Sequence, residues 1–435
     1  MKTRLLFILL FIATTSLTFS QTTSIPDPNF EQALIDLGID SDGIINGEVL
    51  TADVENVLTL DVQGKNISDL SGIEDFVSLT NLNCGDNLLT SVDLSQNTAL
   101  IILVCYYNQF TSLDVTQLVD LEELNCESNQ LTNLDVSQNI NLTSLICTEN
   151  QLNELIINQN TLLEKLLCDN NELTSIDVSQ NILLTELVVT YNQLNEIDVS
   201  QNIELLHLRL TGNLFVEIDV TNNINLISLT AAVNQLTTVD VSQNTSLTSL
   251  SLAFNPLTNQ DLSYNVELST LQIYDTQITN IDLSQNSNLT WIYCFNTPIE
   301  SLNIKNGNTQ AITTMWCTDT PNLDCIQVDA DIVDNIPVTW NYDAGVTFSD
   351  DCEYLGVSDN ELSELSIYPN PTKGSLFVNS TNNDTIQSLQ LYSTTGKLLL
   401  ETKTAEIDLG NLPTGLYLLK IKTDNGISVK KVIKE

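Results

Sequence analysis

Aspartate recurs at one position of a repeated phrase and is the first candidate for chemistry. These carboxylates share a 21-residue period and lie at Asp93, Asp114, Asp135, Asp177, Asp198, Asp219, Asp240, Asp261 and Asp282. If successive copies stack as neighbouring strands do, the side chains lie roughly 4.8 Å apart. Calcium prefers hard oxygen ligands and would bridge Asp93, Asp114 and Asp135, but one carboxylate per copy falls short of the roughly 6–8 oxygens that calcium takes. The alternative is a solvated acidic edge whose repulsion is screened by salt.

A second acidic candidate is the loop GIDSDGIING, whose oxygen-bearing side chains are Asp40, Asp42, Asn46 and Glu48. The loop faintly resembles the calcium loop of an EF-hand. It departs from that pattern at the fifth position, Ile44, and at the twelfth, Thr51, where a glutamate is expected. We therefore favour a capping turn here. No cofactor is predicted, and calcium is the one that the two acidic sets leave open.

His207 is the only histidine, and it stands in register with Glu186 and Ser228 on the copies before and after it. A serine, a histidine and a carboxylate are the side chains of a hydrolytic triad. A flat sheet face offers neither the oxyanion hole nor the strained nucleophile turn that this chemistry also needs. The sequence contains no HExxH, GxSxG or phosphate-binding glycine loop. We therefore predict that the protein is not an enzyme.

The aspartate column and His207 belong to one sequence repeat, in which leucine recurs every 21 residues from Leu79 to Leu289. An apolar residue follows three places later, then a cysteine or aliphatic residue, then an asparagine, as in LEELNCESNQL from Leu121 to Leu131. The phrase resembles the leucine-rich repeat LxxLxLxxNxL over about residues 57–315, in eleven in-register copies. Its alternation of apolar and polar residues predicts a short strand with one buried face.

Stacked copies predict a leucine-rich-repeat solenoid with a curved parallel sheet and a short 3₁₀ or extended convex side. The asparagine amide is expected to bond backbone groups where the chain turns. A solenoid needs different ends. We expect an N-terminal cap over residues 21–56 with a helix in DPNFEQALIDLG. About a dozen coils, which resemble repeats of the internalin type, are then expected to fill residues 57–320, with a C-terminal cap over residues 321–354.

Binding chemistry is indicated on the outward face, at the third, fifth, seventh and eighth places of each copy. Most of these residues are Ser, Thr, Asn or acidic. Aromatic residues interrupt the pattern early, at Tyr106 and Tyr107. They return in a late aromatic block of Tyr274, Trp291, Tyr293, Phe295 and Trp316. Exposed apolar patches mark binding sites, and Trp and Tyr are frequent interface hot spots. Either this block contacts a ligand, or the terminal cap covers it.

Basic residues are scarce, with 14 Lys and Arg against 56 Asp and Glu and a net charge of −42. Nucleic acid and anionic membrane surfaces are excluded as partners, because both require basic patches. Arg209 is one of only four basic residues between the signal peptide and Lys373, and it is expected to meet an acidic group of a ligand. It belongs to a central band, the second candidate for the contact, formed by Leu167, Val188, His207 and Arg209.

Cysteine fills the sixth place of five consecutive copies, from Cys84 to Cys168, and of a later copy at Cys294. In parallel in-register strands the Cβ atoms lie roughly 4.8 Å apart, beyond the roughly 3.5–4.5 Å of a disulfide. We therefore predict reduced thiols that pack as small apolar side chains. Cys325 and Cys352 flank the terminal cap outside this column, and we expect them to form a disulfide.

Both ends of the chain indicate export. Residues 1–20 read as a signal peptide, and neither their apolar core nor any later stretch is long enough to cross a bilayer. Near the other end, SIYPNPTKGSLFV, LQLYSTTGKLLL and IDLGNLPTGLYLLKIKT alternate with Pro and Gly turns and predict a small antiparallel β-sandwich. After a linker over residues 355–361, these phrases resemble the C-terminal sorting domain of the type IX secretion system, over residues 362–435.

This resemblance implies passage across the outer membrane of a Gram-negative bacterium by the type IX secretion machinery. It also implies removal of the domain, followed by release or by attachment to surface lipopolysaccharide, and the sequence does not separate these two outcomes. The sequence thus predicts an exported recognition or adhesion protein that binds a protein or polysaccharide on its concave face. A structural surface-layer component without a specific ligand is the main alternative, and a hydrolase is the other.

Overall fold

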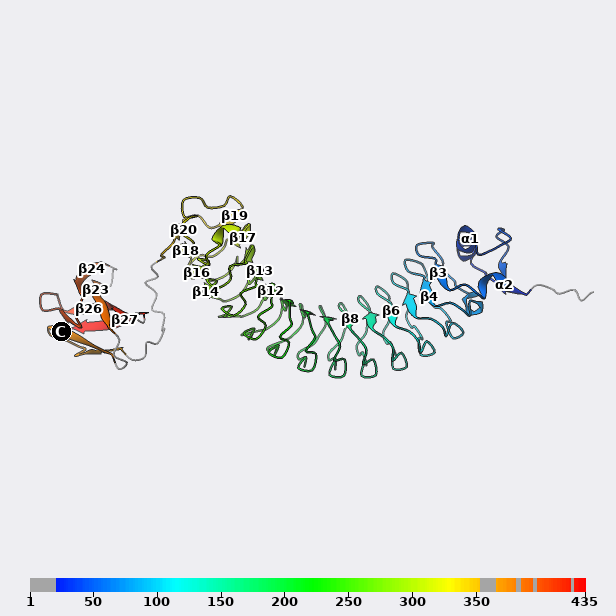
Figure 1. Cartoon of the computed structure of the whole chain (residues 1–435), viewed down its shortest axis with the longest axis horizontal. Coiled ribbons are helices and arrows are strands. Elements are labelled where there is room, and N and C mark those ends of the chain that lie inside the picture. The colour runs from blue at the N-terminus through cyan, green and yellow to red at the C-terminus, as the bar shows by residue number, and fades with distance from the viewer. Residues whose placement is uncertain (1–20, 353–364, 381–384, 394–396, 424–425) are drawn as a thin grey trace, which may run out of the picture. The chain divides into compact units, whose positions relative to one another are not determined.

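The computed structural model describes residues 21–352, 365–380, 385–393, 397–423 and 426–435 (Figure 1). They belong to two compact units, Met1–Cys352 and Glu353–Glu435. The predicted signal peptide, residues 1–20, and the predicted linker, residues 355–361, lie outside the described residues. Each unit has its own hydrophobic core.

The first unit begins with a cap of two strands and two helices, which are β1 (Thr22–Ser24), α1 (Pro28–Asp36), β2 (Glu48–Leu50) and α2 (Thr51–Val54). The helix predicted here is α1, and it starts after Asp27. The Asp27 carboxylate accepts hydrogen bonds from the backbone N–H groups of Asn29 (2.8 Å) and Phe30 (3.2 Å), as helix-capping aspartates do. Phe30 is fully buried and stacks on Phe76 with ring centroids 6.2 Å apart. The cap therefore closes the N-terminal end of the core.

The coils stack through one parallel sheet of 14 short strands, seen along the inner side of the arc in Figure 1. Its strands are β3 (Thr59–Asp61), β4 (Asn81–Asn83), β5 (Ile102–Val104), β6 (Glu123–Asn125), β7 (Ser144–Ile146), β8 (Lys165–Leu167), β9 (Glu186–Val188), β10 (His207–Arg209), β11 (Ser228–Thr230), β12 (Ser249–Ser251), β13 (Thr270–Gln272), β15 (Trp291–Tyr293), β17 (Thr314–Cys317) and β19 (Trp340–Tyr342). Residues 21 places apart pair directly, as Leu124 does with Leu145. The repeat period therefore fixes the strand register.

The core lies between this sheet and a convex side made of turns. Leu124 and Cys126 point inward and are 1 % and 0 % exposed. On the convex side of the same coil, the N–H of Asn139 bonds Val136 O at 3.0 Å, and the N–H of Leu142 bonds Asn139 O at 3.1 Å. These successive i to i+3 bonds form the short 3₁₀-like convex side predicted from the sequence. Two 3₁₀ helices, η1 (Ile73–Asp75) and η2 (Thr309–Ala311), lie near the two ends of the array.

The predicted asparagine column acts as expected. The Asn150 side chain donates to the carbonyl oxygens of Cys126 (3.0 Å) and Cys147 (3.1 Å) and accepts from the N–H of Leu131 (3.0 Å). Each asparagine of this column thus joins two coils and pairs backbone groups that have no strand partner.

A second buried asparagine column, which the sequence analysis did not identify, lines the convex wall. Its members are Asn97, Asn139, Asn160, Asn181, Asn202, Asn223, Asn244, Asn265 and Asn286, all 0 % exposed. The Asn202 amide donates to the carbonyl oxygens of Val178 (3.0 Å) and Asn181 (2.8 Å). Its Oδ1 has no hydrogen-bond partner, and the same is true throughout the column. The amide N–H groups therefore bind the coils at the cost of a buried, unpaired acceptor.

The C-terminal end of the first unit adds further strands to the stack and then closes the core. A second parallel sheet runs along another flank of the last coils and contains β14 (Asn280–Asp282), β16 (Ser301–Asn303), β18 (Cys325–Gln327) and β20 (Thr347–Ser349). The residues predicted as a cap, 321–354, thus supply β18 and β20 to this sheet and β19 to the concave sheet. Trp340 closes the core, since it is 4 % exposed and its indole N–H donates to Ile312 O at 2.9 Å.

The second unit is the small antiparallel β-sandwich predicted from its sequence. One sheet contains β21 (Leu365–Tyr368), β22 (Ser375–Ser380) and β25 (Glu406–Asp408). The other contains β24 (Leu398–Thr402), β23 (Ile386–Ser393), β26 (Gly415–Thr423) and β27 (Gly426–Lys434). Both sheets contribute to one core, as Leu376 and Val378 from the first pack with Leu389 and Leu419 from the second.

Candidate ligand-binding surface

The late aromatic block lies on the outward face of the concave sheet, over β13, β15 and β17 and the turns that follow them. Trp291 is 49 % exposed and Trp316 is 46 % exposed. Tyr274, Tyr293 and Phe295 are partly exposed. The residues predicted as a cap leave the block open to solvent, and Trp340 of that segment packs into the end of the core.

The rings of this block contact one another across successive coils. Tyr274 and Phe295 stack with ring centroids 4.4 Å apart. Trp316 meets Tyr293 and Phe295 edge-on, at 5.9 Å and 6.1 Å. In-register pairing places Tyr293 directly beside Trp316, so the repeat itself brings the rings together. Side chains held by such contacts lose little conformational freedom when a ligand binds.

Polar groups border the block. Burial raises the pKa of the Tyr274 phenol, and the neighbouring negative charge of Asp275 raises it further. The hydroxyl therefore stays protonated over a wide pH range and can donate a hydrogen bond. Asp275 itself accepts a hydrogen bond from the Asn296 side chain. The block thus combines apolar ring faces with a donor and a carboxylate at its edge.

The early aromatic pair forms a smaller exposed feature. Tyr107 is 54 % exposed and meets Tyr106 edge-on, with ring centroids 5.5 Å apart. The Tyr106 ring leans over Gly85, where an added Cβ would lie 2.9 Å from the ring. A side chain at Gly85 would therefore displace the tyrosine.

Ion pairs and burial involve several residues of the central band. Glu186 lies 3.7 Å from Lys165 Nζ and 3.8 Å from the Arg209 guanidinium, so Arg209 already faces a carboxylate. Val188 is buried, at 6 % exposed. The His207 Nδ1 is buried without a hydrogen-bond partner. Among the described residues no hydrogen bond joins His207 to Glu186 or Ser228, so these three side chains do not form a linked triad.

Three exposed apolar residues of the same face were missed by the sequence analysis. Tyr191, Val233 and Phe254 are 54 %, 43 % and 47 % exposed. All three occupy the eighth place of their coils, the place that Tyr107 occupies in an earlier coil. Phe254 also meets Tyr274 edge-on at 5.3 Å, which connects it to the late aromatic block. Comparing the eighth residue of every copy would have revealed all three.

Each aspartate of the column accepts a hydrogen bond within its own turn. Asp135 Oδ1 accepts a hydrogen bond from the N–H of Ser137 at 2.9 Å, and every aspartate of the column does the same with the residue two places on. Bonds to the backbone and the hydroxyl of Ser137 lower the pKa of Asp135, so the carboxylate stays charged. Within the described ranges, no group of three or more His, Cys, Asp or Glu side chains is placed to hold a metal ion.

The acidic loop at Asp40 is also organised by internal hydrogen bonds. Asp42 accepts from the N–H of Ile44 (2.8 Å) and from the Asn46 side chain (2.9 Å). Asp40 is 5 % exposed and accepts from the N–H of Asp42 at 3.2 Å. Burial and the charges of Asp42 and Glu31 raise the pKa of Asp40. These contacts are those of a turn within the N-terminal cap.

The thiol column behaves as predicted. Cys84, Cys105, Cys126, Cys147, Cys168, Cys294 and Cys317 are all free and buried. Burial raises the pKa of Cys84 and of Cys126 to about 12. At neutral pH these thiols are therefore protonated and unreactive, because the thiolate is the reactive species.

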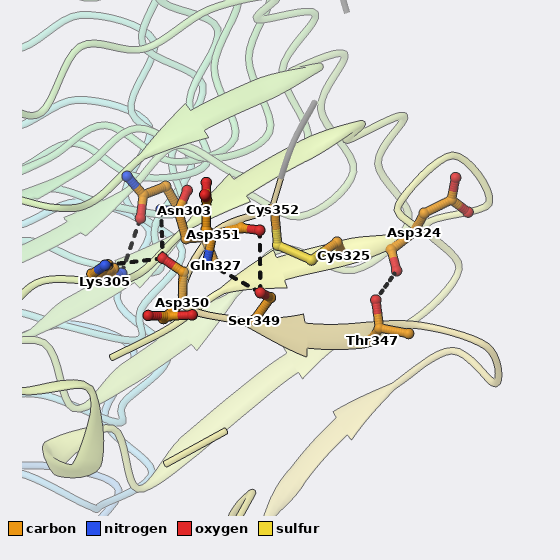
Figure 2. The surroundings of a disulfide bond; sticks show 10 residues. All are labelled: Asn303, Lys305, Asp324, Cys325, Gln327, Thr347, Ser349, Asp350, Asp351 and Cys352. Carbon is orange, nitrogen blue, oxygen red and sulfur yellow. Dashed lines mark hydrogen bonds between the residues drawn. A yellow bond between two sulfur atoms is a disulfide. The ribbon is translucent and has the colours of Figure 1, made fainter. Parts of the chain in front are cut away.

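The predicted disulfide between Cys325 and Cys352 is present, with Cα atoms 5.9 Å apart (Figure 2). It ties β18 to the segment that follows β20. Beside it, Asp350 O accepts hydrogen bonds from Lys305 Nζ (2.9 Å) and from the Gln327 amide (3.2 Å). The last described residues of the first unit are thus fastened both covalently and by hydrogen bonds.

Comparison with known proteins assigns both units. The family profile of the secretion system C-terminal sorting domain matches residues 366–435. No curated protein matches the chain in sequence. Among solved structures, the functional domain of InlJ from Listeria monocytogenes, described as including a cysteine ladder, is 26 % identical with a TM-score of 0.59. That match covers 97 % of this chain and 100 % of the other.

Two further structures show the same fold. An internalin, InlF, from Listeria monocytogenes is 21 % identical, with a TM-score of 0.59 over 76 % of this chain and 96 % of the other. A leucine-rich repeat protein from Bacteroides eggerthii is 15 % identical, with a TM-score of 0.54 over 68 % of this chain and 58 % of the other.

These findings define the class of protein. The chain is an exported leucine-rich-repeat protein with an internalin-like solenoid. Its second unit is a type IX secretion sorting domain, which directs it to the cell surface or the extracellular space. None of the helices in the part of the chain that the structure describes has the length and apolar character needed to cross a bilayer.

Proposed function

We propose that this protein recognises a macromolecular ligand, a protein or a polysaccharide, on its concave face and does so without catalysis. The observation that carries the proposal is the late aromatic block, in which Trp291 and Trp316 remain about half exposed. Soluble proteins rarely expose such patches unless they bind something, and Trp and Tyr dominate interface hot spots. An exported protein has ligands of this kind within reach at the cell surface.

The absence of catalysis is part of the proposal. Glu186 faces Lys165 and Arg209, and this arrangement leaves no oriented carboxylate for His207. In a hydrolytic triad the serine nucleophile needs a histidine base, and the histidine needs a carboxylate that orients it. A hydrolysis screen with pooled glycans and peptides tests this point, and turnover by the wild-type protein would contradict it.

Surface attachment is also a proposal. The sorting domain supports export, after which the solenoid is either released or held on lipopolysaccharide. Fractionation of the producing cells distinguishes these outcomes, because an attached protein sediments with the outer membrane and a released one stays in the medium.

A paired screen tests ligand recognition. The wild-type protein and the variant W291A/Y293A/W316A are applied to a glycan array and used in a pull-down of surface proteins. We expect at least one ligand to bind the wild type and to be lost by the variant. The matched control is Tyr264→Ala, which removes a 58 % exposed aromatic side chain from the convex side.

The alternatives predict other outcomes. A structural surface-layer component without a specific ligand gives no hit in either screen. A ligand that binds elsewhere on the solenoid is retained equally by the wild type and by the triple variant. Either result would remove the late aromatic block as the binding site.

A further inference from the structure

The eighth residue of each coil has an unusual backbone conformation. Its φ is positive in twelve successive coils, at Asp86, Tyr107, Ser128, Glu149, Asn170, Tyr191, Gly212, Val233, Phe254, Asp275, Asn296 and Asp319. Glycine, asparagine and aspartate adopt this left-handed conformation most readily, whereas a β-branched or bulky residue there is an outlier. Six of these coils follow that preference, and Tyr107, Ser128 and Glu149 depart from it in earlier coils. Tyr191, Val233 and Phe254 break it within one short stretch, with φ of 50°, 55° and 53°.

The fold gives no reason for these three residues. Their side chains are between 43 % and 54 % exposed, so they add little to the core. Each therefore combines an unfavourable backbone conformation with an apolar surface left in water. Residues that are unfavourable in both respects are expected where an outside contact compensates for them. We call Tyr191, Val233 and Phe254, with Gly212 between them, the left-handed ridge.

The ridge is continuous across its coils. An added Cβ at Gly212 would collide with the Tyr191 ring, so this ring lies across the glycine toward the coil of Val233. At the other end Phe254 contacts Tyr274, with ring centroids 5.3 Å apart. Three coil steps separate Tyr191 from Phe254, which is about 14 Å at the usual strand spacing. This length suits a short extended segment rather than a single side chain.

Carboxylates border the ridge at both ends of the same column. Glu149 lies two coils before Tyr191, and Asp275 lies one coil after Phe254. A further carboxylate, Asp169, also lies before the ridge and accepts a hydrogen bond from the Thr148 hydroxyl at 2.8 Å. The nearest basic residues in sequence, Lys165 and Arg209, already face Glu186. The ridge is thus an apolar surface between acidic ends.

We propose that the left-handed ridge docks a protein segment with an apolar centre and basic ends. Its apolar side chains would cover Tyr191, Val233 and Phe254, and its Lys or Arg side chains would meet Glu149 and Asp275. The net charge of −42 attracts such a partner over distance and repels acidic ones. This inference rests on the proposed use of the concave face and deepens it, because it selects a protein over a polysaccharide.

Specific features favour a protein. Val233 is aliphatic and offers dispersion contacts but no ring face for a sugar. One face of the Tyr191 ring is already covered by Gly212, and Phe254 is turned edge-on to Tyr274. A basic peptide gains from cation–π contact with the remaining aromatic surface and from the bordering carboxylates.

The test uses the full chain and three probes in a binding titration. The first probe is a peptide with a Leu-Val-Leu centre and two arginines at each end, the second carries glutamates in place of the arginines, and the third is cellohexaose. We expect only the arginine peptide to bind, with affinity that falls as salt is raised. In the variant Y191N/V233N/F254N its affinity should fall by about tenfold or more, which is a loss of about 1.4 kcal/mol.

The same variant separates binding from folding. Because asparagine tolerates the left-handed conformation, its unfolding midpoint should equal or exceed that of the wild type. The control I140N/I203N/I224N changes three aliphatic residues that are 51–55 % exposed on the convex side, and it should bind like the wild type. Equal binding of the glutamate peptide, binding of cellohexaose at the ridge, unchanged affinity in the ridge variant or equal loss in the control would each overturn the inference. W291A/Y293A/W316A reports on the proposed function separately, since it leaves the ridge intact.

Discussion

At the scale of single residues, buried side-chain amides connect adjacent coils by hydrogen bonds. Asn150 pairs backbone groups beside the concave sheet, and Asn202 pairs carbonyls beside the convex wall. The two sites differ in one respect, because Oδ1 is bonded in Asn150 and unpaired in Asn202. Both asparagines lie in otherwise apolar surroundings. Each therefore stabilises the solenoid through its hydrogen bonds and not through burial of apolar surface.

Replacing Asn150 tests this reading. In Asn150→Ala the N–H of Leu131 loses its partner, and the carbonyls of Cys126 and Cys147 each lose one of theirs. We expect a loss of about 2 kcal/mol, since an unpaired buried donor costs roughly 1–3 kcal/mol. Chemical denaturation measures it, and Asn153→Ala, at an exposed position of the same coil, is the control. Equal midpoints for the two variants would refute the role given to Asn150.

The buried thiols predict a pH dependence. An unfolded cysteine titrates near pH 9.0, whereas burial raises the pKa of Cys84 and Cys126 to about 12. The unfolded chain therefore loses these protons first, and the free energy of unfolding falls as the pH rises from 9 toward 12, by about 1.4 kcal/mol per unit for each such thiol. Denaturation midpoints of the wild type and of Cys126→Ala at pH 7 to 11 measure this effect. The wild type should show the steeper decline, and parallel curves would contradict the assignment.

At the scale of elements, the C-terminal end of the solenoid depends on a covalent link. The disulfide joins Cys325 in β18 to Cys352, 27 residues further along the chain. Closing a loop of this size is worth roughly 3 to 4 kcal/mol in the chain-entropy account. The energy should act locally, because each coil of a solenoid contacts only its neighbours.

Reduction of the disulfide should therefore loosen one end of the molecule. In Cys352→Ser we expect faster amide hydrogen exchange in β18 and β20, with strands near the centre, such as β9, unchanged. Mass spectrometry of exchanged peptides measures both regions in one experiment. Uniform acceleration over the whole first unit would show that the link stabilises the array globally.

The aspartate turns should need no metal. One carboxylate oxygen of Asp135 and of each of its equivalents already accepts a hydrogen bond from its own turn. We expect the same thermal midpoint in calcium and in chelator. A rise in the midpoint on adding calcium, lost in Asp114→Asn/Asp135→Asn, would instead establish a metal site along the column.

Periodicity made most elements predictable, because one strand and one asparagine place recur through the array. Periodicity gave no signal for residues whose burial or exposure differs from what their type suggests. The second asparagine column stands among polar residues in the sequence, as Asn139 does after Ser137 and Gln138. Only the three-dimensional turn shows that its amide points inward and is buried. Tyr191 and Phe254 were missed because a single aromatic residue per coil forms no cluster in the sequence. The strand β19 was expected as cap, because its spacing departs from 21 residues.

At the scale of the whole molecule, a repeating framework leaves its outward face free to vary. The inward columns and the two asparagine columns hold the solenoid, so the outward residues are free to serve recognition. On that face the apolar exceptions gather toward the later coils, from Tyr191 to Trp316. The sorting domain explains how such a surface reaches the outside of the cell. Export and the proposed recognition thus belong to separate units of the chain.

The most direct test measures the affinity of a ligand identified by the paired screen for three proteins: the wild type, W291A/Y293A/W316A and Tyr264→Ala. Hot-spot aromatic residues contribute about 2 kcal/mol or more each, so we expect the triple variant to bind at least about a hundredfold more weakly. Tyr264→Ala should match the wild type. Equal affinity of all three proteins would contradict the claim that the late aromatic block is the binding site.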